Sequence, residues 1–229
     1  MIFDPLYLIM IVPALLLSIY AQVKVKSTYS KFSQVPTFRG VTGAQAAQMI
    51  LKASGVHDVS IEITRGFLSD HYDPRSKVLR LSESVYAGNS IASVGVAAHE
   101  AGHAIQDAFA YAPLKLRSAL VPVSNLGSNL SWPLLIIGFI FMSQSLILAG
   151  ILFFTLAVLF QIITLPVEFN ASSRALTALP ATGILSEDEV KGARKVLSAA
   201  ALTYVAAASA AILQLLYFIM RAGLLGRDE

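Results

Sequence analysis

Cysteine is absent from this chain of 229 residues. Disulfides, thiolate zinc sites and cysteine nucleophiles are therefore excluded. Charge is also scarce, because only 14% of the residues are Asp, Glu, Lys or Arg whereas 55% are hydrophobic. An average soluble domain has about 25% charged and about 45–50% apolar residues. With a mean hydropathy of +0.66, the apolar residues are too numerous for one buried core, so we predict an integral membrane protein in contact with the lipid bilayer.

Long intervals without charge mark the candidate membrane spans, because a spanning helix needs about 20 predominantly apolar residues. Uncharged intervals of 19, 50 and 25 residues follow Asp4, Arg117 and Lys195. The polar Ser143-Gln144-Ser145 segment divides the middle interval, which predicts a tight helical hairpin. We predict a single membrane domain over residues 1–229. Its spans are expected at about 3–23, 120–142, 146–166 and 198–220, and a lobe at about 24–117 and 167–197.

The distribution of Lys and Arg predicts the orientation, because cytoplasmic loops are enriched in both. Residues 24–117 carry 11, residues 168–195 carry 4, the hairpin carries none and the C-terminal tail carries 2. We therefore expect the lobe in the cytoplasm and both termini outside. Asp4 stands where a signal peptide would be basic, which favours an uncleaved anchor. No run of about 5–8 basic residues occurs, so nucleic acid is not an expected partner.

Two stretches of the lobe alternate apolar and polar residues as half-buried strands do, Val59–Ile63 and Val78–Leu81. Asp73-Pro74-Arg75-Ser76 between them has proline at the second position of a turn. We therefore predict a β-hairpin. The second strand would offer an edge for an extended substrate.

Helix signals flank these strands. Thr42 can cap a helix through residues 45–51, and Gly55 can end it. A small-residue-rich helix is expected from about residue 89 or 90 to about Ala110, and a capping box at Ser186-Glu187-Asp188-Glu189 begins the helix of the last span. The predicted fold is mainly α, with about four transmembrane helices and a small cytoplasmic α+β lobe.

The sequence His99-Glu100-Ala101-Gly102-His103 lies in this small-residue-rich helix and is an H-E-x-x-H motif. Residues four apart share a helix face, so His99 and His103 can bind one Zn²⁺ while Glu100 projects beside the site toward a water. The flanking residues from Val96 to Ile105 are uncharged, as expected of a helix buried behind a metal. The alternative is a pair of buried histidines without a metal.

A catalytic zinc usually has three protein ligands and one open position. No histidine follows His103, and Phe109 excludes the extended motif with a third histidine. Asp107 lies on the same face but one turn too far along. Glu168, the first charge after 50 uncharged residues, is better placed as the third ligand. It could instead be an interfacial charge or a partner of Arg174.

The chain resembles the YugP-type membrane-associated neutral zinc metallopeptidases, an HExxH, gluzincin-like family, over nearly its whole length. The resemblance rests on four strings, which are 70–75, 78–83, 94–106 and 165–172. It implies a membrane-embedded zinc peptidase with His99, His103 and Glu168 as ligands and Glu100 as the catalytic acid/base. The HtpX and CAAX-prenyl endopeptidases are similar in placing such a site at the cytoplasmic membrane face. They usually carry an aspartate four residues after the third ligand, where this chain has Ser172.

The expected function is zinc-dependent hydrolysis of a peptide or protein substrate at the cytoplasmic face of a prokaryotic cell membrane. Zinc lowers the pKa of a bound water, and Glu100 acts as general acid/base. The transition state needs a further donor besides zinc. The candidates for this role are His71, Tyr72, Arg174 and Tyr204.

Two other functions are compatible with the motif. An intramembrane, site-2-like zinc protease is one, since residues 84–98 are uncharged; however, Asn89, Ser90 and Ser93 make that stretch weakly apolar, and no Asp-Gly ligand motif follows. A non-catalytic membrane scaffold with a structural zinc is the other. Structural zinc sites usually have four protein ligands, and this chain supplies only three obvious ones.

Overall fold

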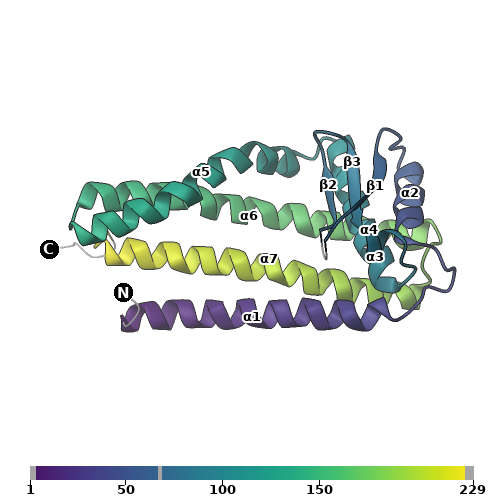
Figure 1. Ribbon diagram of the computed structural model, residues 1–229, viewed down its shortest axis with the longest axis horizontal. Helices are drawn as coiled ribbons and strands as arrows, with labels where there is room; N and C mark the ends of the chain where they lie inside the picture. The colour runs from purple at the N-terminus through teal and green to yellow at the C-terminus, as the bar shows by residue number, and fades with distance from the viewer. Residues whose placement is uncertain (1–3, 67–68, 225–229) are drawn as a thin grey trace. The chain divides into compact units, whose positions relative to one another are not determined.

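A computed structural model describes residues 4–66 and 69–224 (Figure 1). By its contacts the chain divides into two compact units. The bundle unit comprises Met1–Ala21, Lys115–Pro166 and Thr203–Glu229, and the site unit comprises Gln22–Leu114 and Val167–Leu202. The described elements are, in chain order, α1 (Pro5–Ser33), α2 (Gly43–Ala53), β1 (Ser60–Thr64), β2 (His71–Asp73), β3 (Val78–Ser82), α3 (Glu83–Tyr86), α4 (Ile91–Ala108), α5 (Ala112–Ile140), α6 (Gln144–Ala181) and α7 (Glu187–Arg221).

Four of the described helices, α1, α5, α6 and α7, are long and apolar enough to cross a membrane. Only 11% to 33% of the most apolar window of each is buried within the protein. Large apolar side chains of the bundle unit, such as Ile9 (72% exposed) and Leu152 (65% exposed), face outward. Lipid is the solvent that matches such a surface. The predicted fold class, mainly α with four candidate spans and a small α+β region, is confirmed.

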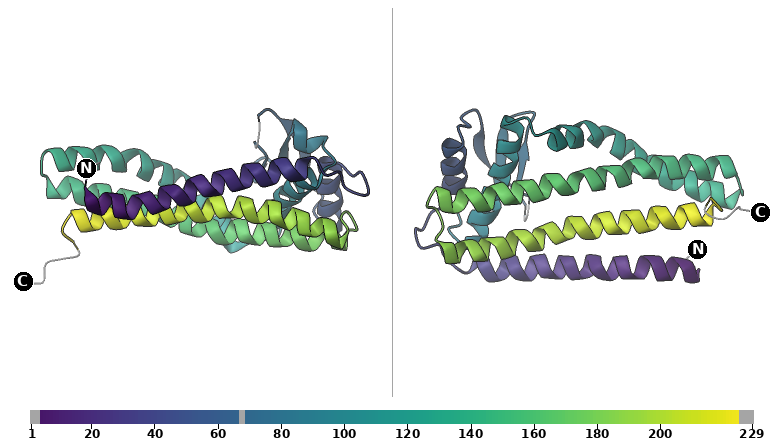
Figure 2. Two further views of the ribbon diagram at one scale, coloured as in Figure 1. Left: turned by 90° about the horizontal axis from the view of Figure 1, so that it is seen from below. Right: turned by 180° about the vertical axis from the view of Figure 1, so that it is seen from behind.

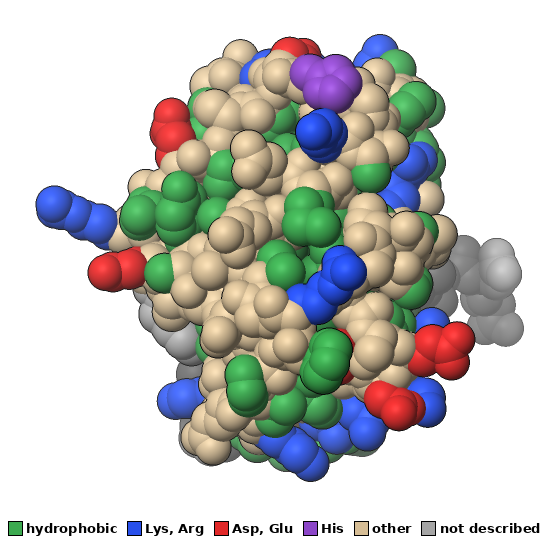
Figure 3. All heavy atoms as spheres, turned by 90° about the vertical axis from the view of Figure 1, so that its right-hand side faces the viewer, with side chains coloured by type: hydrophobic (Ala, Val, Ile, Leu, Met, Phe, Trp, Pro, Cys, Tyr) green, Lys and Arg blue, Asp and Glu red, His purple; other side chains and the backbone are tan. Residues whose placement is uncertain are grey.

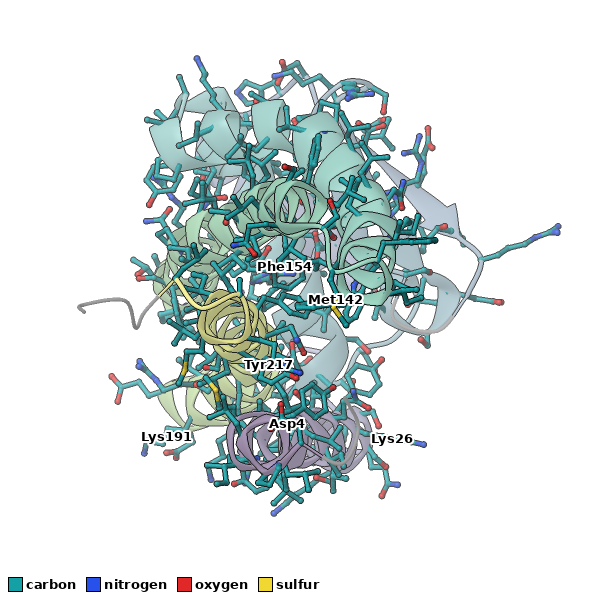
Figure 4. The ribbon with its side chains drawn as sticks, turned by 90° about the vertical axis from the view of Figure 1, so that its left-hand side faces the viewer. Asp4, Lys26, Met142, Phe154, Lys191 and Tyr217 are labelled. Atoms are coloured by element: carbon teal, nitrogen blue, oxygen red, sulfur yellow. The ribbon has the colours of Figure 1, made fainter. Side chains whose placement is uncertain are left out.

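The core of the bundle unit is apolar and aromatic. Leu135 and Ile147 from the predicted hairpin pack with Tyr217 and Phe218 of α7. Phe154 meets Phe218 edge to face, with ring centroids 5.4 Å apart. Figure 4 labels Tyr217, Phe154 and Met142 of this unit.

Three polar contacts join different segments at one end of the bundle unit. The Tyr217 hydroxyl donates to Asp4 Oδ2 at 3.2 Å, and Arg221 Nε lies 3.9 Å from the same oxygen. Gln144 Nε2, at the start of α6, donates to the Ala222 carbonyl at 3.4 Å. The start of α1, the end of α7 and the connection between α5 and α6 therefore lie at the same end of this unit. This is the arrangement expected of four spans with both termini on one side.

The sheet of the site unit contradicts the predicted hairpin. β1 pairs in parallel with β3, with Ser60 opposite Val78, and β2 pairs antiparallel with β3. The strand order is β1-β3-β2, so the Pro74 turn joins β2 to β3. β2 has only three residues, too few for an alternating pattern to be recognised in the sequence. A parallel pairing of β1 with β3 needs a long connection between them, and β2 lies within that connection. Because β3 is paired on both sides, the predicted substrate edge along residues 78–81 is wrong.

Local helix signals are confirmed in the site unit. Thr42 and Gln45 form a complete capping box at α2, and Gly55 follows the helix with a positive φ of 72°. Ser90 caps α4, since its Oγ accepts from Ser93 N at 3.1 Å. Ser186 and Glu189 cap each other at the start of α7. These helices enclose a core with the sheet. Fully buried members of that core include Ile50, Leu79, Leu81, Val94, Ala175 and Leu179.

Candidate metal centre

The helix α4 carries the H-E-x-x-H residues, and α6 approaches it closely. His99 and His103 are one turn apart, with ring centroids 4.7 Å apart and planes at 84°. A Cβ on Gly102, between them, would lie only 2.5 Å from the Ala171 carbonyl oxygen of α6. Only glycine therefore permits this spacing of the two helices, and the spacing brings Glu168 of α6 to the two histidines.

Three side chains converge at this point. One ligand atom from each of His99, His103 and Glu168 can be chosen so that all lie within 4.8 Å of one another. Glu168 Oε2 is 3.2 Å from His99 Nε2 and 3.6 Å from His103 Nε2. Ligands about 2.0–2.1 Å from a tetrahedral zinc are about 3.4 Å apart, so these separations and this donor set fit zinc. Glu168, the first charge after the long uncharged interval, thus lies close enough to both histidines to share a metal with them, and its role as a ligand stays a prediction.

Ser172 supports His99 from the same helix as Glu168. Its Oγ lies 3.1 Å from His99 Nδ1. A proton on Nδ1 donated to this hydroxyl leaves Nε2 free to face a metal. Ser172 therefore occupies the place, one turn after Glu168, where the similar endopeptidases usually carry an aspartate.

His103 is supported by a chain of amides that reaches Arg174. Its Nδ1 lies 3.0 Å from Gln106 Oε1. Gln106 is fully buried, and its Nε2 donates to the Val167 carbonyl at 2.8 Å and to Asn170 Oδ1 at 3.0 Å. Arg174 Nε donates to the same Asn170 oxygen at 2.8 Å. We call these four residues, His103, Gln106, Asn170 and Arg174, the amide relay.

The direction of every hydrogen bond in the amide relay follows from its charged end. A guanidinium only donates, so the atom of Asn170 that meets Arg174 is its oxygen. That oxygen can only accept from Gln106, so the amide nitrogen of Gln106 faces Asn170 and its oxygen faces His103. The Nδ1 of His103 must then carry the proton. Its Nε2 lone pair is left for a metal.

Electrostatics keep the site compatible with a cation. Burial lowers the pKa of His103, but its hydrogen bond with Glu168 and the negative charge of Glu100 outweigh burial and raise the pKa above its ordinary value. Metal and proton therefore compete for the same nitrogen, and metal binding would release a proton. Two buried carboxylates are the source of the attraction in either case.

Glu100 is adjacent to the ligands without belonging to them. Its side chain is 8% exposed. It is not part of the three-residue group, and none of the hydrogen bonds found among the described residues involves its carboxylate. A carboxylate in this position is available to a water molecule beside the metal site, as the motif predicts.

The predicted transition-state donors come from different elements. His71 is exposed on β2, and its Nδ1 lies 2.8 Å from the Ser69 carbonyl. Tyr204 lies half-buried on α7 in the bundle unit. Arg174 is half-buried, belongs to the amide relay and lies 6.0 Å over the Tyr111 ring. The catalytic roles of all three stay predictions.

Tyr72 and Asp107 form a separate contact between β2 and α4. The Tyr72 hydroxyl donates to Asp107 Oδ2 at 2.8 Å, and Lys77 Nζ lies 3.1 Å from the same oxygen. Burial and the negative Asp107 raise the pKa of Tyr72, so its phenol stays protonated. Asp107 is thus bonded to Tyr72 and Lys77 and is not part of the group formed by His99, His103 and Glu168.

Sequence reasoning missed Gln106 and Asn170. Both are uncharged and separated by 64 positions, and each lies within one of the strings on which the family resemblance rests. Position offered the only signal: Gln106 is one turn after His103, and Asn170 is two residues after Glu168.

Comparison with known proteins identifies a family. Residues 7–223 match the family described as "Putative neutral zinc metallopeptidase". The chain belongs to this family. It is also 49% identical to the "Putative membrane protease YugP" of Bacillus subtilis (strain 168), over 98% of this chain and 99% of that protein. No solved structure matches the chain. The resemblance predicted from the four strings is confirmed, and family membership supports a protease role and zinc as the metal.

Proposed function

We propose that this protein is a zinc-dependent, membrane-bound endopeptidase that hydrolyses peptide bonds at the cytoplasmic membrane face. The observation that carries the proposal is the convergence of His99, His103 and Glu168 from two helices, with buried Glu100 beside them. Family membership supports the reaction, and four apolar helices support the membrane location.

Each residue of the site has a distinct role in the proposed reaction. His99, His103 and Glu168 would hold the metal and leave a fourth position open. When bound, zinc acidifies a water molecule and polarises the substrate carbonyl. Glu100 accepts a proton from the attacking water and delivers it to the leaving amine as the carbon–nitrogen bond breaks. The amide relay and Ser172 keep both imidazoles in the tautomer that can bind a metal.

An extended substrate would lie along β2 instead of β3. β2 is an edge strand of the sheet, and the contact of Tyr72 with Asp107 holds it against α4. Pairing with a free strand edge holds a peptide backbone without reading many side chains. His71 is exposed on this strand, which keeps it a candidate for contact with substrate.

The intramembrane alternative is less well supported, because α4 is not among the four helices that are long and apolar enough to span a membrane. The scaffold alternative requires a fourth protein ligand. Among the described residues only three His, Asp or Glu side chains converge at the site.

Zinc content and casein cleavage, measured on the same detergent-purified samples, test the proposal. Glu100→Gln should keep zinc and lose about 10²–10⁴-fold in turnover, because the amide preserves shape but accepts no proton. Glu168→Ala, His99→Ala and His103→Ala should each lose zinc. Exposed Glu83→Gln is the matched control and should change neither quantity. Near-wild-type cleavage by zinc-replete Glu100→Gln would contradict the mechanism. Full zinc occupancy in Glu168→Ala would mean that a residue other than Glu168 is the third ligand.

The membrane side is tested separately by cysteine labelling, which is clean in a cysteine-free chain. Lys52 on α2 and Ser145 at the start of α6 are both exposed. An impermeant thiol reagent applied to intact cells should label Ser145→Cys and spare Lys52→Cys until the cells are opened. The opposite pattern would place the site outside the cytoplasm without changing the chemistry.

A further inference from the structure

A basic groove lies between α1 and α7 in the site unit. Its volume is about 590 Å³. Four of its lining side chains are cations, two from each helix: Lys24, Lys31, Arg194 and Lys195. No Asp or Glu is among the residues that line it. Figure 2 shows α1 running beside α7 in both views.

Helix packing fixes the walls of this basic groove. Tyr29 of α1 is buried against Val196 of α7. A Cβ on Gly192 would come within 2.9 Å of the Phe32 ring, so the two helices are in close contact here. Phe32 and Leu202 line the groove together with the four cations. The groove therefore combines a positive rim with apolar walls.

The four cations lack internal counter-charges. Within residues 4–66 and 69–224, none of them forms an ion pair with a carboxylate, whereas neighbouring Lys191 of α7 lies 2.7 Å from Asp188. Four like charges around one groove repel one another unless an anion joins them. Figure 3 shows one face of the molecule, on which Lys and Arg side chains are spread out and some of them have Asp or Glu side chains nearby.

The basic groove also lies where both helices change from polar to apolar sequence. Lys24 directly follows the uncharged residues 5–23, and Leu202 belongs to the uncharged residues 196–220 that follow Lys195. Such a boundary is where phospholipid headgroups lie, and basic pockets between transmembrane helices bind anionic headgroups.

We propose that the basic groove binds an anionic phospholipid, with its phosphate among the four cations and an acyl chain against Ala199 and Leu202, which follow Lys195 in the apolar part of α7. The apolar walls favour a lipid over a free phosphate, which would leave them unused. The proposal goes beyond peptide hydrolysis and does not depend on the metal site.

Native mass spectrometry of the full-length protein in neutral detergent, titrated with phosphatidylglycerol or phosphatidylcholine, tests this proposal. The wild-type protein should bind phosphatidylglycerol about tenfold more tightly than phosphatidylcholine. Lys31→Gln/Arg194→Gln removes one groove cation from each helix and should weaken phosphatidylglycerol binding about 10–30-fold. Lys26→Gln/Lys191→Gln, on the same helices but outside the groove (Figure 4), is the matched control and should bind like wild type.

Two further arms complete the test. Lys31→Arg/Arg194→Lys keeps the charges and should restore binding, which separates charge from misfolding. Excess inorganic phosphate should displace little lipid, because it makes no contact with the apolar walls. Equal binding of the two lipids by wild type, equal losses in the groove and control variants, or full displacement by phosphate would each overturn the proposal. Loss of binding that the charge-keeping variant fails to restore would overturn it too.

Discussion

The bundle unit and the site unit differ in which side chains they expose and which they bury. In the bundle unit, large apolar side chains such as Leu16 (61% exposed) and Leu152 point outward, and the hydrogen bonds that Tyr217 and Gln144 make with other segments lie at one end. In the site unit, the fully buried Gln106 side chain has hydrogen-bond partners inside the protein for both its oxygen and its nitrogen. Lipid can cover the apolar side chains that the bundle unit exposes, whereas the candidate metal centre depends on helix packing that brings its ligands and their hydrogen-bond partners together. The site unit should therefore be the less tolerant of substitution.

The largest effect is expected from a substitution at the contact between α4 and α6, which tests whether the site unit tolerates little change. Gly102→Ala would push its Cβ against the Ala171 carbonyl and displace Glu168, three residues earlier in α6. We expect destabilisation by about 1–3 kcal/mol and a loss of zinc. Zinc stoichiometry and thermal unfolding in detergent measure both effects.

Gly95→Ala is the matched control on the same helix. Its Cβ would meet the Ala193 Cβ at 3.6 Å, an ordinary contact. Alanine also favours a helix over glycine by about 0.8–1.0 kcal/mol, so this variant should keep its zinc and its stability. Similar behaviour of the two variants would show that the helix spacing does not position the site.

The amide relay gives the next largest expected effect. Asn170→Leu removes the oxygen that accepts from both Gln106 and Arg174, so His103 loses the constraint on its tautomer. Zinc affinity measured by chelator competition should fall about 10–100-fold. Asn170→Asp keeps an acceptor for both donors and should stay close to wild type. An equal loss in Asn170→Asp would mean that the relay does not work through this acceptor.

The smallest expected effect lies in the bundle unit. Tyr217→Phe removes the hydrogen bond to Asp4 and keeps the aromatic packing with Phe218. It should cost about 0.5–1.5 kcal/mol of stability and leave zinc affinity unchanged. A loss of zinc affinity as large as that in Asn170→Leu would show that the two units are coupled, which would break the comparison.

Features set by neighbouring residues were predictable. The caps at Thr42, Ser90 and Ser186 depend on a side chain and a backbone group three positions away, so the sequence shows them directly. The hairpin break between α5 and α6 is equally local. Strand pairing is not local, and the same alternation is compatible with antiparallel and parallel partners. The predicted β1–β3 hairpin was wrong for this reason.

In the candidate site, too, local features were predictable from the sequence and contacts between distant segments were not. The sequence by itself determined the four apolar helices, the pairing of His99 and His103 on one helix face, and Glu168 as the isolated acid after a long uncharged interval. The tertiary structure alone decided that α6 passes close enough to Gly102 for three ligands to meet, and that Gln106 and Asn170 connect His103 to Arg174. Helical periodicity depends on residues that are close together in the sequence, so the sequence alone shows it. Hydrogen bonds between distant segments form only when packing has brought those segments together.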